Sequence, residues 1–521
     1  MYDPAGLTVL VLFGVAILIA QVVARRTGVN GPILLLVAGA ALAAVPATAA
    51  LRVPPELVVL LFLPALLYWE SLTTSLQAIR ADLRTVVLSS VFLVLATAAT
   101  VAAAAHVVLG LSWPVGFVLG AIVAPTDATA VAAVGVHLPR RQLTMLRAES
   151  LVNDGTAFVL FAAAVAVASG AEPFSTPNVL GDFALSYLGG IAIGVLLARL
   201  AMLARRVAPD ALTQNVVSVL TPFAAFLLAE EVHASGVLAV VVCGLVLSRL
   251  GPRSIGADTR LQAHAFWQIV TFLLNATLFL LIGLQLPAAL ASVSATPGFA
   301  LAAAALVSAV VVVTRLVWMN AVPYLVRALD RRPGQRTRRI GARQRLPLAW
   351  AGFRGAVSLA IALAVPLTTV DGAPFPHRDL LLVVTFGVIL VTLVGQGLTL
   401  PAVVRAARYD PDTAVDDEIA LAYERMADAA LADLPRLAEE RGIPEDVVAR
   451  LRVEEERRRR PPPEPVGADR EHDLRLALVQ ARRRTLLRLR DAAVIDDQVL
   501  LRVQSELDVE ELALRGGADP G

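Results

Sequence analysis

Apolar residues run along the chain in long stretches that are separated by short polar connections. Most stretches hold roughly 17–25 residues, the length that an α-helix needs to cross a bilayer. Thirteen stretches can be drawn, at residues 6–24, 31–48, 55–78, 84–108, 114–136, 143–169, 181–205, 211–230, 234–250, 264–288, 298–327, 346–367 and 378–402. The pattern predicts an all-α polytopic membrane protein with about thirteen transmembrane helices.

The composition agrees with this fold class. The chain has 521 residues, of which 57% are hydrophobic and 17% are charged, whereas about a quarter of the residues in a soluble domain are charged. The mean hydropathy is +0.71. A net charge of +2 gives no argument for a nucleic-acid partner. The single cysteine, Cys243, excludes an intrachain disulfide and is interpreted as an inert apolar residue.

Arginines alternate between the connections and thereby predict the topology. The odd-numbered connections contain Arg25 and Arg26, Arg80 and Arg84, Arg140 and Arg141, Arg205 and Arg206, Arg249, Arg253 and Arg260, and the cluster Arg331 to Arg345. Because basic connections stay in the cytoplasm, we expect a cell-membrane protein with its N-terminus outside and its C-terminus cytoplasmic. No positive region precedes the first stretch, so no cleavable signal peptide is expected.

Two of the predicted spans look interrupted. The fifth contains Pro125, which frees a backbone carbonyl one turn earlier, and the twelfth contains Gly352-Phe353-Arg354-Gly355. They lie seven helices apart and so cross the bilayer in opposite directions, as in an inverted-topology repeat. Paired broken helices of this kind indicate a substrate site near the midplane. The alternative is that proline and glycine are ordinary residues of membrane helices.

Several acids interrupt the apolar pattern near these breaks. Ser150 and Asp154 lie four residues apart and share one face of the sixth span. A carboxylate beside a hydroxyl suits a small cation that prefers oxygen ligands. Asp154 can then hold a proton or a cation, but not comfortably both, and this competition is itself an exchange mechanism. The alternative is a polar cluster that only packs helices together.

Three further residues complete the predicted site. Thr126 and freed carbonyls of the broken fifth span could complete a cation shell, with Asp127 either lining the site or capping the second half-helix. Glu70 in the third span is a second candidate ligand. Its alternative role is that of an interfacial residue beside the aromatic pair Tyr68 and Trp69.

A buried guanidinium requires an acid, because an unpaired charge at membrane depth is costly. For Arg354 in the twelfth span we expect Glu149 as the partner, with Asn153 alongside. This pair would tie the sixth span to the twelfth, and the alternative is that Arg354 is a mobile gate. Arg315 in the eleventh span also requires a partner, which the sequence does not identify.

Residues 403–521, which follow the last apolar stretch, are rich in Arg, Glu and Asp. Within them, segments 414–457 and 468–513 are compatible with helices. We expect a transmembrane domain at 1–402 and a cytoplasmic helical tail that serves as a partner, regulatory or assembly module. The chain has no Gly-rich phosphate loop and no HExxH or CxxC spacing. It is therefore expected to use no cofactor and not to be an enzyme.

The motifs together resemble one family, bacterial sodium/proton antiporters of the NhaP type in the monovalent cation/proton antiporter-1 family. The resemblance covers about 1–402. Five motifs carry it, namely Phe62-Leu63-Pro64-Ala65-Leu66-Leu67-Tyr68-Trp69-Glu70, Ala124-Pro125-Thr126-Asp127-Ala128, Glu149-Ser150-Leu151-Val152-Asn153-Asp154-Gly155, Phe279-Leu280-Leu281-Ile282-Gly283-Leu284-Gln285 and Gly352-Phe353-Arg354-Gly355-Ala356-Val357-Ser358-Leu359-Ala360. Tyr68-Trp69 is bulkier than this family pattern leads us to expect.

The resemblance implies a thirteen-helix inverted-repeat fold, a homodimer and an elevator-like movement of a core domain against a dimer domain. It implies Asp154 as the carrier of cation and proton, Thr126, Ser150 and Glu70 as ligands, and Asp127, Glu149, Asn153 and Arg354 as the supporting network. The Asn153-Asp154 pair resembles the electroneutral group of antiporters.

The expected function is therefore electroneutral exchange of one Na⁺ for one H⁺ across the membrane, with K⁺ or Li⁺ as alternative cations. Two rival classes remain at this point. A cation channel would pass current without proton coupling. A membrane-embedded hydrolase would use the acids as general acid and base, but the sequence shows no nucleophile or metal motif for it.

Overall fold

The computed structural model divides the chain into two compact units, Met1–Asp410 and Pro411–Gly521. We call them the transmembrane unit and the tail unit and describe each by itself. The structure describes residues 5–29, 31–49, 54, 57–74, 76–81, 86–128, 131, 138–171, 176–251, 255–292, 297–329, 341–409, 414–459, 478–486, 488–489, 503, 507 and 511. Among these residues the regular secondary structure is helical, apart from one isolated bridge between Thr368 and Pro374.

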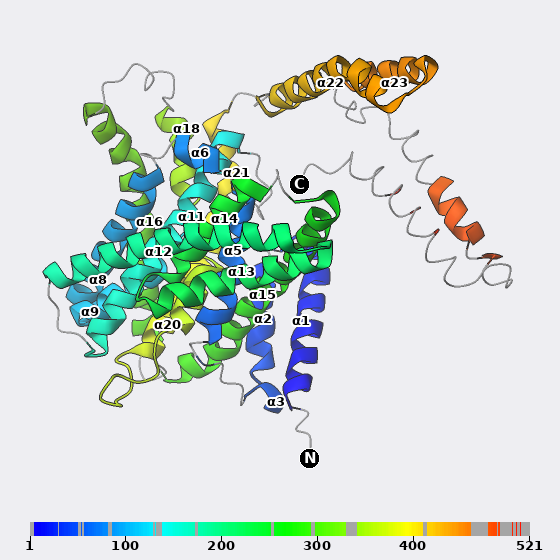
Figure 1. The fold of residues 1–521 in the computed structure, drawn as a ribbon. Helices are drawn as coiled ribbons and strands as arrows, with labels where there is room; N and C mark the ends of the chain where they lie inside the picture. The colour runs from blue at the N-terminus through cyan, green and yellow to red at the C-terminus, as the bar shows by residue number, and fades with distance from the viewer. Residues whose placement is uncertain are drawn as a thin grey trace. The chain divides into compact units, whose positions relative to one another are not determined.

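The transmembrane unit is a helical bundle (Figure 1). Its described helices are α1 (Ala5–Thr27), α2 (Gly31–Leu42), α3 (Pro46–Ala49), η1 (Val58–Phe62), α5 (Leu63–Thr73), α6 (Leu76–Ala81), η2 (Leu88–Phe92), α8 (Leu93–Leu109), α9 (Trp113–Val123), α11 (Arg140–Ala168), α12 (Thr176–Val207), α13 (Ala211–Glu231), α14 (Gly236–Leu250), α15 (Ala257–Ser292), α16 (Pro297–Leu329), α18 (Ala342–Trp350), α19 (Ala356–Leu363), α20 (Arg378–Leu390), η4 (Val391–Gln396) and α21 (Gly397–Ala407). The three η segments are π-helical turns.

Each predicted span overlaps between one and three of these helical segments. In the described part of the chain, eight helices are long and apolar enough to cross a membrane, and α2, η1 with α5, α9 and α14 are shorter apolar helices. The eight are α1, η2 with α8, α11, α12, α13, α15, α16, and α20 through α21. The protein is thus a helical multi-span membrane protein, while the number of thirteen crossings stays a prediction.

Both predicted interruptions coincide with breaks in helical structure. α9 ends at Val123, and residues 125–127 are not helical. α18 ends at Trp350 and α19 begins at Ala356, which leaves five non-helical residues between them. The second half of the fifth predicted span lies mostly outside the described residues.

Capping residues place several helix ends where the sequence provides them. The Asp210 side chain accepts a hydrogen bond from the Thr213 backbone nitrogen at 2.8 Å and thereby begins α13. Hydrogen bonds from Thr213 lower the pKa of the exposed Asp210 carboxyl. Ser235 caps α14 in the same way, through the Leu238 nitrogen at 3.2 Å. α8 ends at Leu109 and is followed by Gly110, whose φ of 70° is left-handed.

The helices of the transmembrane unit pack as two bundles. The first, here called the scaffold, contains α1, α2, α5, α12, α13, α14 and α15. α2 and α15 cross so closely that a Cβ at Gly39 would overlap the Leu280 carbonyl, and a Cβ at Gly283 would overlap the Leu36 carbonyl. Glycine at these two positions lets the backbones touch, as small residues do between membrane helices.

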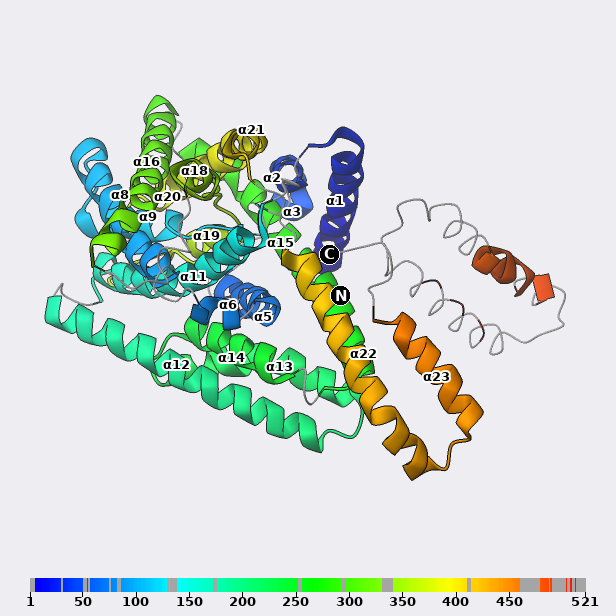
Figure 2. The same cartoon turned by 90° about the horizontal axis from the view of Figure 1, so that it is seen from above.

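The second bundle, here called the core bundle, contains α8, α9, α11, α16, α18, α19 and α20. Seen from above (Figure 2), α12, α13 and α14 line one side of the unit, while α8, α9, α16 and α20 lie on another. The bundles meet where α15 packs against α19 and α20, and where α11 packs against α14. Glu70 on α5 and Ser150 and Asp154 on α11 belong to helices that also meet across this junction.

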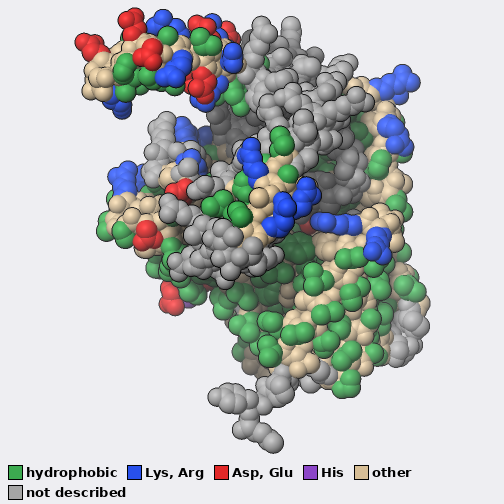
Figure 3. All heavy atoms as spheres, turned by 90° about the vertical axis from the view of Figure 1, so that its right-hand side faces the viewer, with side chains coloured by type: hydrophobic (Ala, Val, Ile, Leu, Met, Phe, Trp, Pro, Cys, Tyr) green, Lys and Arg blue, Asp and Glu red, His purple; other side chains and the backbone are tan. Residues whose placement is uncertain are grey.

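The surface of α1 is apolar along most of its length. Leu7, Leu10, Leu18 and Ile19 are each more than half exposed, and Arg25 and Arg26 occupy the last turn. Figure 3 views this side of the unit, where hydrophobic side chains cover the lower part and arginines gather above them. Such a surface is stable only in contact with lipid or with another apolar surface.

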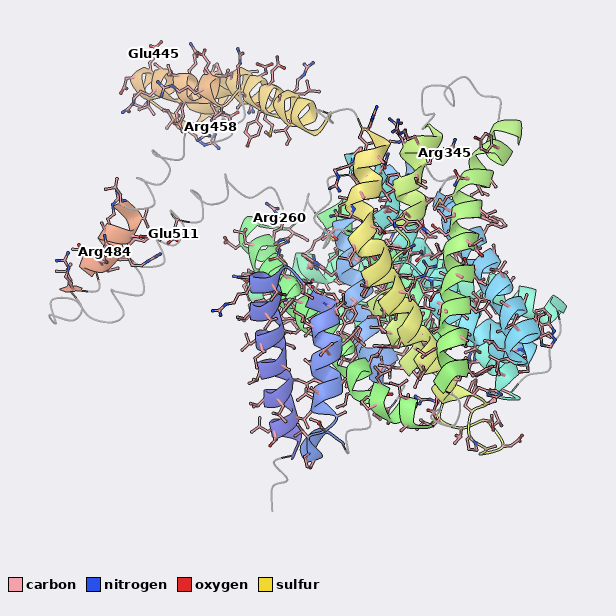
Figure 4. The ribbon with its side chains drawn as sticks, turned by 180° about the vertical axis from the view of Figure 1, so that it is seen from behind. Arg260, Arg345, Glu445, Arg458, Arg484 and Glu511 are labelled. Atoms are coloured by element: carbon pink, nitrogen blue, oxygen red, sulfur yellow. The ribbon has the colours of Figure 1, made fainter. Side chains whose placement is uncertain are left out.

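The tail unit contains α22 (Ala414–Arg441) and α23 (Glu445–Arg457). Gly442, with a φ of 63°, and Pro444 separate the two helices within the predicted 414–457 segment. Charged side chains project around both helices, including the labelled Glu445 and Arg458 (Figure 4). Of the predicted 468–513 segment, the described residues are helical, and Val479, Leu486 and Leu507 form a small buried cluster.

Candidate ion-binding site

The two helix breaks meet inside the core bundle. Pro125 has no backbone N–H, so the chain cannot continue α9 in regular helix. Two residues later, the backbone nitrogen of Asp127 donates to the carbonyl of Phe353 at 2.8 Å. This hydrogen bond joins the break after α9 to the break between α18 and α19.

Arg354 extends from the second break to the end of α9. Its Nε donates to the carbonyl of Val123 at 2.8 Å, and its Nη2 lies 3.5 Å from the carbonyl of Ala124. Its Nη1 donates to the carbonyl of Gly352. The last carbonyls of a helix lack intrahelical donors and carry partial negative charge, so a guanidinium stabilises this end of α9.

Asp127 makes the reciprocal contact. Its carboxylate lies against Gly355, the residue before α19, so that a Cβ on residue 355 would come within 2.6 Å of the Asp127 Cγ. The first N–H groups of a helix carry partial positive charge, which favours a carboxylate there. Each break therefore places a charge at the end of the other break's half-helix.

The sixth predicted span is bonded to the first break by two side chains of α11. Ser150 Oγ donates to the carbonyl of Thr126 at 2.8 Å, and Asn153 Nδ2 donates to the hydroxyl of Thr126 at 2.8 Å. Ser150 and Asn153 are both 2% exposed. Thr126 thus receives hydrogen bonds from two side chains of α11.

Asp154 lies one turn beyond Ser150 on α11. Its side chain is 2% exposed, and its Oδ1 is buried without a hydrogen-bond partner. It interacts electrostatically with the carboxyls of Glu70 and Asp127. Glu70, on α5 of the scaffold, also has one buried carboxylate oxygen, Oε1, without a partner, and it interacts with Asp127 and Ser150.

The ion pair expected between Glu149 and Arg354 is wrong. Glu149 forms its salt bridge with Arg315 of α16, and both side chains are 1% exposed. Arg315 also donates through Nη2 to the carbonyl of Leu348 at 3.1 Å, so it joins α16 to α11 and α18. Arg354 remains within electrostatic range of Glu149. Its hydrogen bonds, however, go to backbone carbonyls.

The geometry explains why the sequence assigned the wrong arginine. Arg354 follows a break in which unpaired carbonyls lie within its reach, and these carbonyls satisfy its N–H groups. Arg315 lies on an uninterrupted helix with no motif around it, and 166 residues separate it from Glu149. The one available signal was that an arginine in an apolar span requires an acid.

The arrangement can hold one small cation or one proton. Burying an ionised carboxylate without a partner costs several kcal/mol. Binding of a cation or of a proton at Asp154 removes that cost. Among the described residues, no three His, Cys, Asp or Glu side chains gather closely enough to hold a metal ion. A cation bound here would therefore take hydroxyl and carbonyl oxygens in addition to a carboxylate.

Comparison with known proteins shows the family of the chain. A family model described as sodium/hydrogen exchanger, transmembrane, matches residues 12–406. An uncharacterised Na⁺/H⁺ exchanger of Mycobacterium tuberculosis is 46% identical over 99% of this chain and 97% of its own length. A sodium, potassium, lithium and rubidium/H⁺ antiporter of Bacillus pumilus is 29% identical over 74% of this chain and 59% of its own length.

A solved structure shares the fold. The sodium proton antiporter MjNhaP1 from Methanocaldococcus jannaschii matches with a TM-score of 0.59 and 20% sequence identity. The match covers 78% of this chain and all of the other chain. At this identity the likeness concerns the fold alone.

Proposed function

Because the chain belongs to the sodium/hydrogen exchanger family, with the features of an NhaP-type cation/proton antiporter, we propose that it exchanges one Na⁺ for one H⁺ at Asp154. The observation that carries this proposal is the buried Oδ1 of Asp154, which lacks a hydrogen-bond partner. A proton or Na⁺ fills this position, and each excludes the other.

The ligand shell combines residues from both bundles. Asp154, Ser150 and Thr126 belong to the core bundle, and Glu70 belongs to the scaffold on α5. The hydroxyls of Ser150 and Thr126 each keep lone pairs that can face a cation. A site shared between two bundles opens when one bundle moves relative to the other, so the movement of the core bundle carries the ion.

The supporting residues fix the charge of the site. Arg315 neutralises Glu149, and Asp127 and Arg354 lie at opposite half-helix ends, where the backbone dipoles stabilise them. Asn153 adds an amide and no charge beside Asp154. A single carboxylate that changes protonation exchanges one proton for one monovalent ion, so the cycle moves no net charge.

The proposal also covers the cations that the site accepts and the topology of the chain in the membrane. The name of the Bacillus pumilus relative includes potassium and lithium, and K⁺ and Li⁺ compete with Na⁺ at the same oxygens. The chain lies in the cell membrane with thirteen crossings in inverted repeats, its N-terminus outside, and forms a homodimer. The sequence places the domain boundary at 402, whereas the compact transmembrane unit ends at Asp410. The residues that follow form a cytoplasmic regulatory tail. Removal of the tail should shift the pH profile of exchange.

The test is exchange by the purified protein in liposomes, with internal pH followed after a Na⁺ gradient is imposed. Asp154→Asn should abolish exchange, whereas Asp258→Asn, at an exposed acid in the first turn of α15, should leave it unchanged. Wild-type exchange should not depend on membrane voltage. Exchange by Asp154→Asn at the wild-type rate would contradict the site, and a current without proton movement would favour a channel.

A further inference from the structure

One arginine of α18 is buried, and two of its nitrogens have no hydrogen-bond partner. Arg345 is 7% exposed, and its Nε and Nη1 are buried and meet no hydrogen-bond acceptor. Within the described part of the chain no salt bridge joins it to an acid. A buried guanidinium without an anion is costly, and five N–H donors give it a strong requirement for one.

A contact with an aromatic ring leaves Nε and Nη1 of Arg345 without a hydrogen-bond acceptor. The guanidinium carbon lies 5.3 Å from the centre of the Tyr324 ring on α16, and this contact engages the face of the cation. Figure 4 places Arg345 near the end of α18 that lies beside α16. By contrast, Arg343, two residues earlier, is exposed and donates through Nε to the carbonyl of Ala406 at 2.7 Å.

The adjacent helix end provides further donors for the same anion. α18 begins at Ala342 after Gly341, and no side chain caps it. The first backbone N–H groups of a helix therefore point outward here and carry partial positive charge. Because Cα–Cβ bonds tilt toward the helix N-terminus, the Arg345 side chain extends toward this end of α18.

We infer that Arg345 and the N-terminus of α18 bind a phosphate group, supplied by the head group of an anionic phospholipid or by free phosphate. A guanidinium matches phosphate with two parallel N–H bonds, and helix N-termini bind phosphate through backbone N–H groups. Arg343, two residues before Arg345 on the same helix, adds a second positive charge near this end of α18.

The position of the site links it to the broken helix. α18 is the first half of the interrupted twelfth span, and the carbonyl of Leu348, three residues beyond Arg345, accepts a hydrogen bond from Arg315. A phosphate at the start of α18 therefore holds the half-helix that contacts the Glu149–Arg315 pair. Basic pockets between helices on the arginine-rich side of a membrane protein suit lipid head groups.

The experiment follows thermal unfolding of the full-length protein in detergent. Phosphatidylglycerol, phosphatidylcholine and sodium phosphate are titrated separately. We expect phosphatidylglycerol to raise the Tm saturably and phosphatidylcholine to raise it less. A rise with phosphatidylglycerol alone identifies a lipid head group, and an equal rise with sodium phosphate identifies free phosphate.

Three variants make the assignment specific. Arg345→Gln should raise the half-saturating ligand concentration at least about tenfold. Arg345→Lys should keep part of the rise in Tm. Arg206→Gln, at an exposed arginine in the last turn of α12, should behave as wild type. Without ligand, Arg345→Gln should unfold at or above the wild-type Tm, because it removes an unpaired buried charge.

Several outcomes overturn the inference. The first is a ligand-dependent Tm rise that persists in Arg345→Gln. The second is a wild-type Tm that rises with neither phosphate source. The third is a ligand response in Arg206→Gln that is lost as completely as in Arg345→Gln. A fourth is a ligand-free Arg345→Gln that fails to fold or melts well below wild type, because the arginine would then have a structural partner in the protein.

Discussion

The carboxylate of Asp127 lies against Gly355, in the space that a Cβ on residue 355 would occupy. One break thus provides the acid, and the other provides a residue without a side chain at the start of α19. The contact brings a negative charge to the positive end of that half-helix. It couples the two breaks more tightly than the Asp127–Phe353 hydrogen bond alone.

Gly355→Ala should therefore displace either Asp127 or α19. We expect exchange in liposomes to fall at least about tenfold, since a 1 Å misplacement at a reacting site has effects of this order. The matched control is Gly341→Ala at the start of α18, where a Cβ would meet nothing within 4 Å. Normal exchange by Gly355→Ala would show that the Asp127 contact is not required.

The two breaks could be predicted because their causes are local. Pro125 removes a donor, and Gly352 and Gly355 flank a charge, so each break is visible within a few residues of sequence. The stripe of Ser150 and Asp154 follows equally from helical spacing. The burial of Ser150 and Asp154 agrees with that spacing.

The partner of Glu149 could not be predicted in this way. Two arginines, Arg315 and Arg354, lay in apolar spans, and each required a counter-charge or acceptor. The choice between them depends on which helix ends expose carbonyls in three dimensions, and the α9 end exposes Val123 to Arg354. The close crossing of α2 and α15 at Gly39 and Gly283 is likewise a property of packing that single-chain periodicity does not contain.

The second prediction concerns the Glu149–Arg315 pair. Removing one partner of a buried pair leaves an unpaired charge, so Glu149→Gln or Arg315→Met should each destabilise the protein by about 3–5 kcal/mol. The double variant should lose much less free energy of unfolding than the two single variants lose together. Thermal unfolding in detergent measures all three, with the exposed Arg206→Met as the control.

A second double-variant cycle, with Glu149 and Arg354, shows which of the two arginines is the partner of Glu149. If Glu149 pairs with Arg315, coupling between them should exceed the coupling between Glu149 and Arg354 by more than about 1 kcal/mol. The reverse order would restore Arg354 as the partner and contradict the geometry.

The third prediction concerns Thr126. Thr126→Val removes the hydroxyl that accepts from Asn153 Nδ2 and leaves this buried donor unsatisfied, at a cost of about 1–3 kcal/mol. It also removes a proposed ligand oxygen, so the KM for Na⁺ should rise. The control is Thr271→Val on α15, where the buried hydroxyl donates to Trp267 of its own helix. An unchanged KM in Thr126→Val would remove this residue from the ligand shell.

Tyr409 follows α21 and joins the ends of two helices of the core bundle. Its hydroxyl lies 2.6 Å from Gln142 Oε1 of α11 and 2.8 Å from the carbonyl of Gln344 of α18, and these two acceptors share its one proton. Burial raises the pKa of Tyr409 to about 12, and the hydrogen bond to Gln142 opposes this rise. Since an unfolded tyrosine titrates near 10, the contribution to stability is complete below about pH 10 and is lost as the pH rises through about 12.

Tyr409→Phe should therefore lower the stability by about 1 kcal/mol and by the same amount at pH 6, 7.5 and 9, because the hydroxyl stays protonated throughout. Thermal unfolding at these three pH values measures the difference, and Tyr423→Phe in α22 of the tail unit is the control. The pH profile of exchange should keep its shape in Tyr409→Phe even if the maximal rate falls. A stability difference that changes between pH 6 and 9, or a shifted pH profile, would mean that Tyr409 is coupled to a group that titrates in this range, and Asp154 of α11 would be the first to examine.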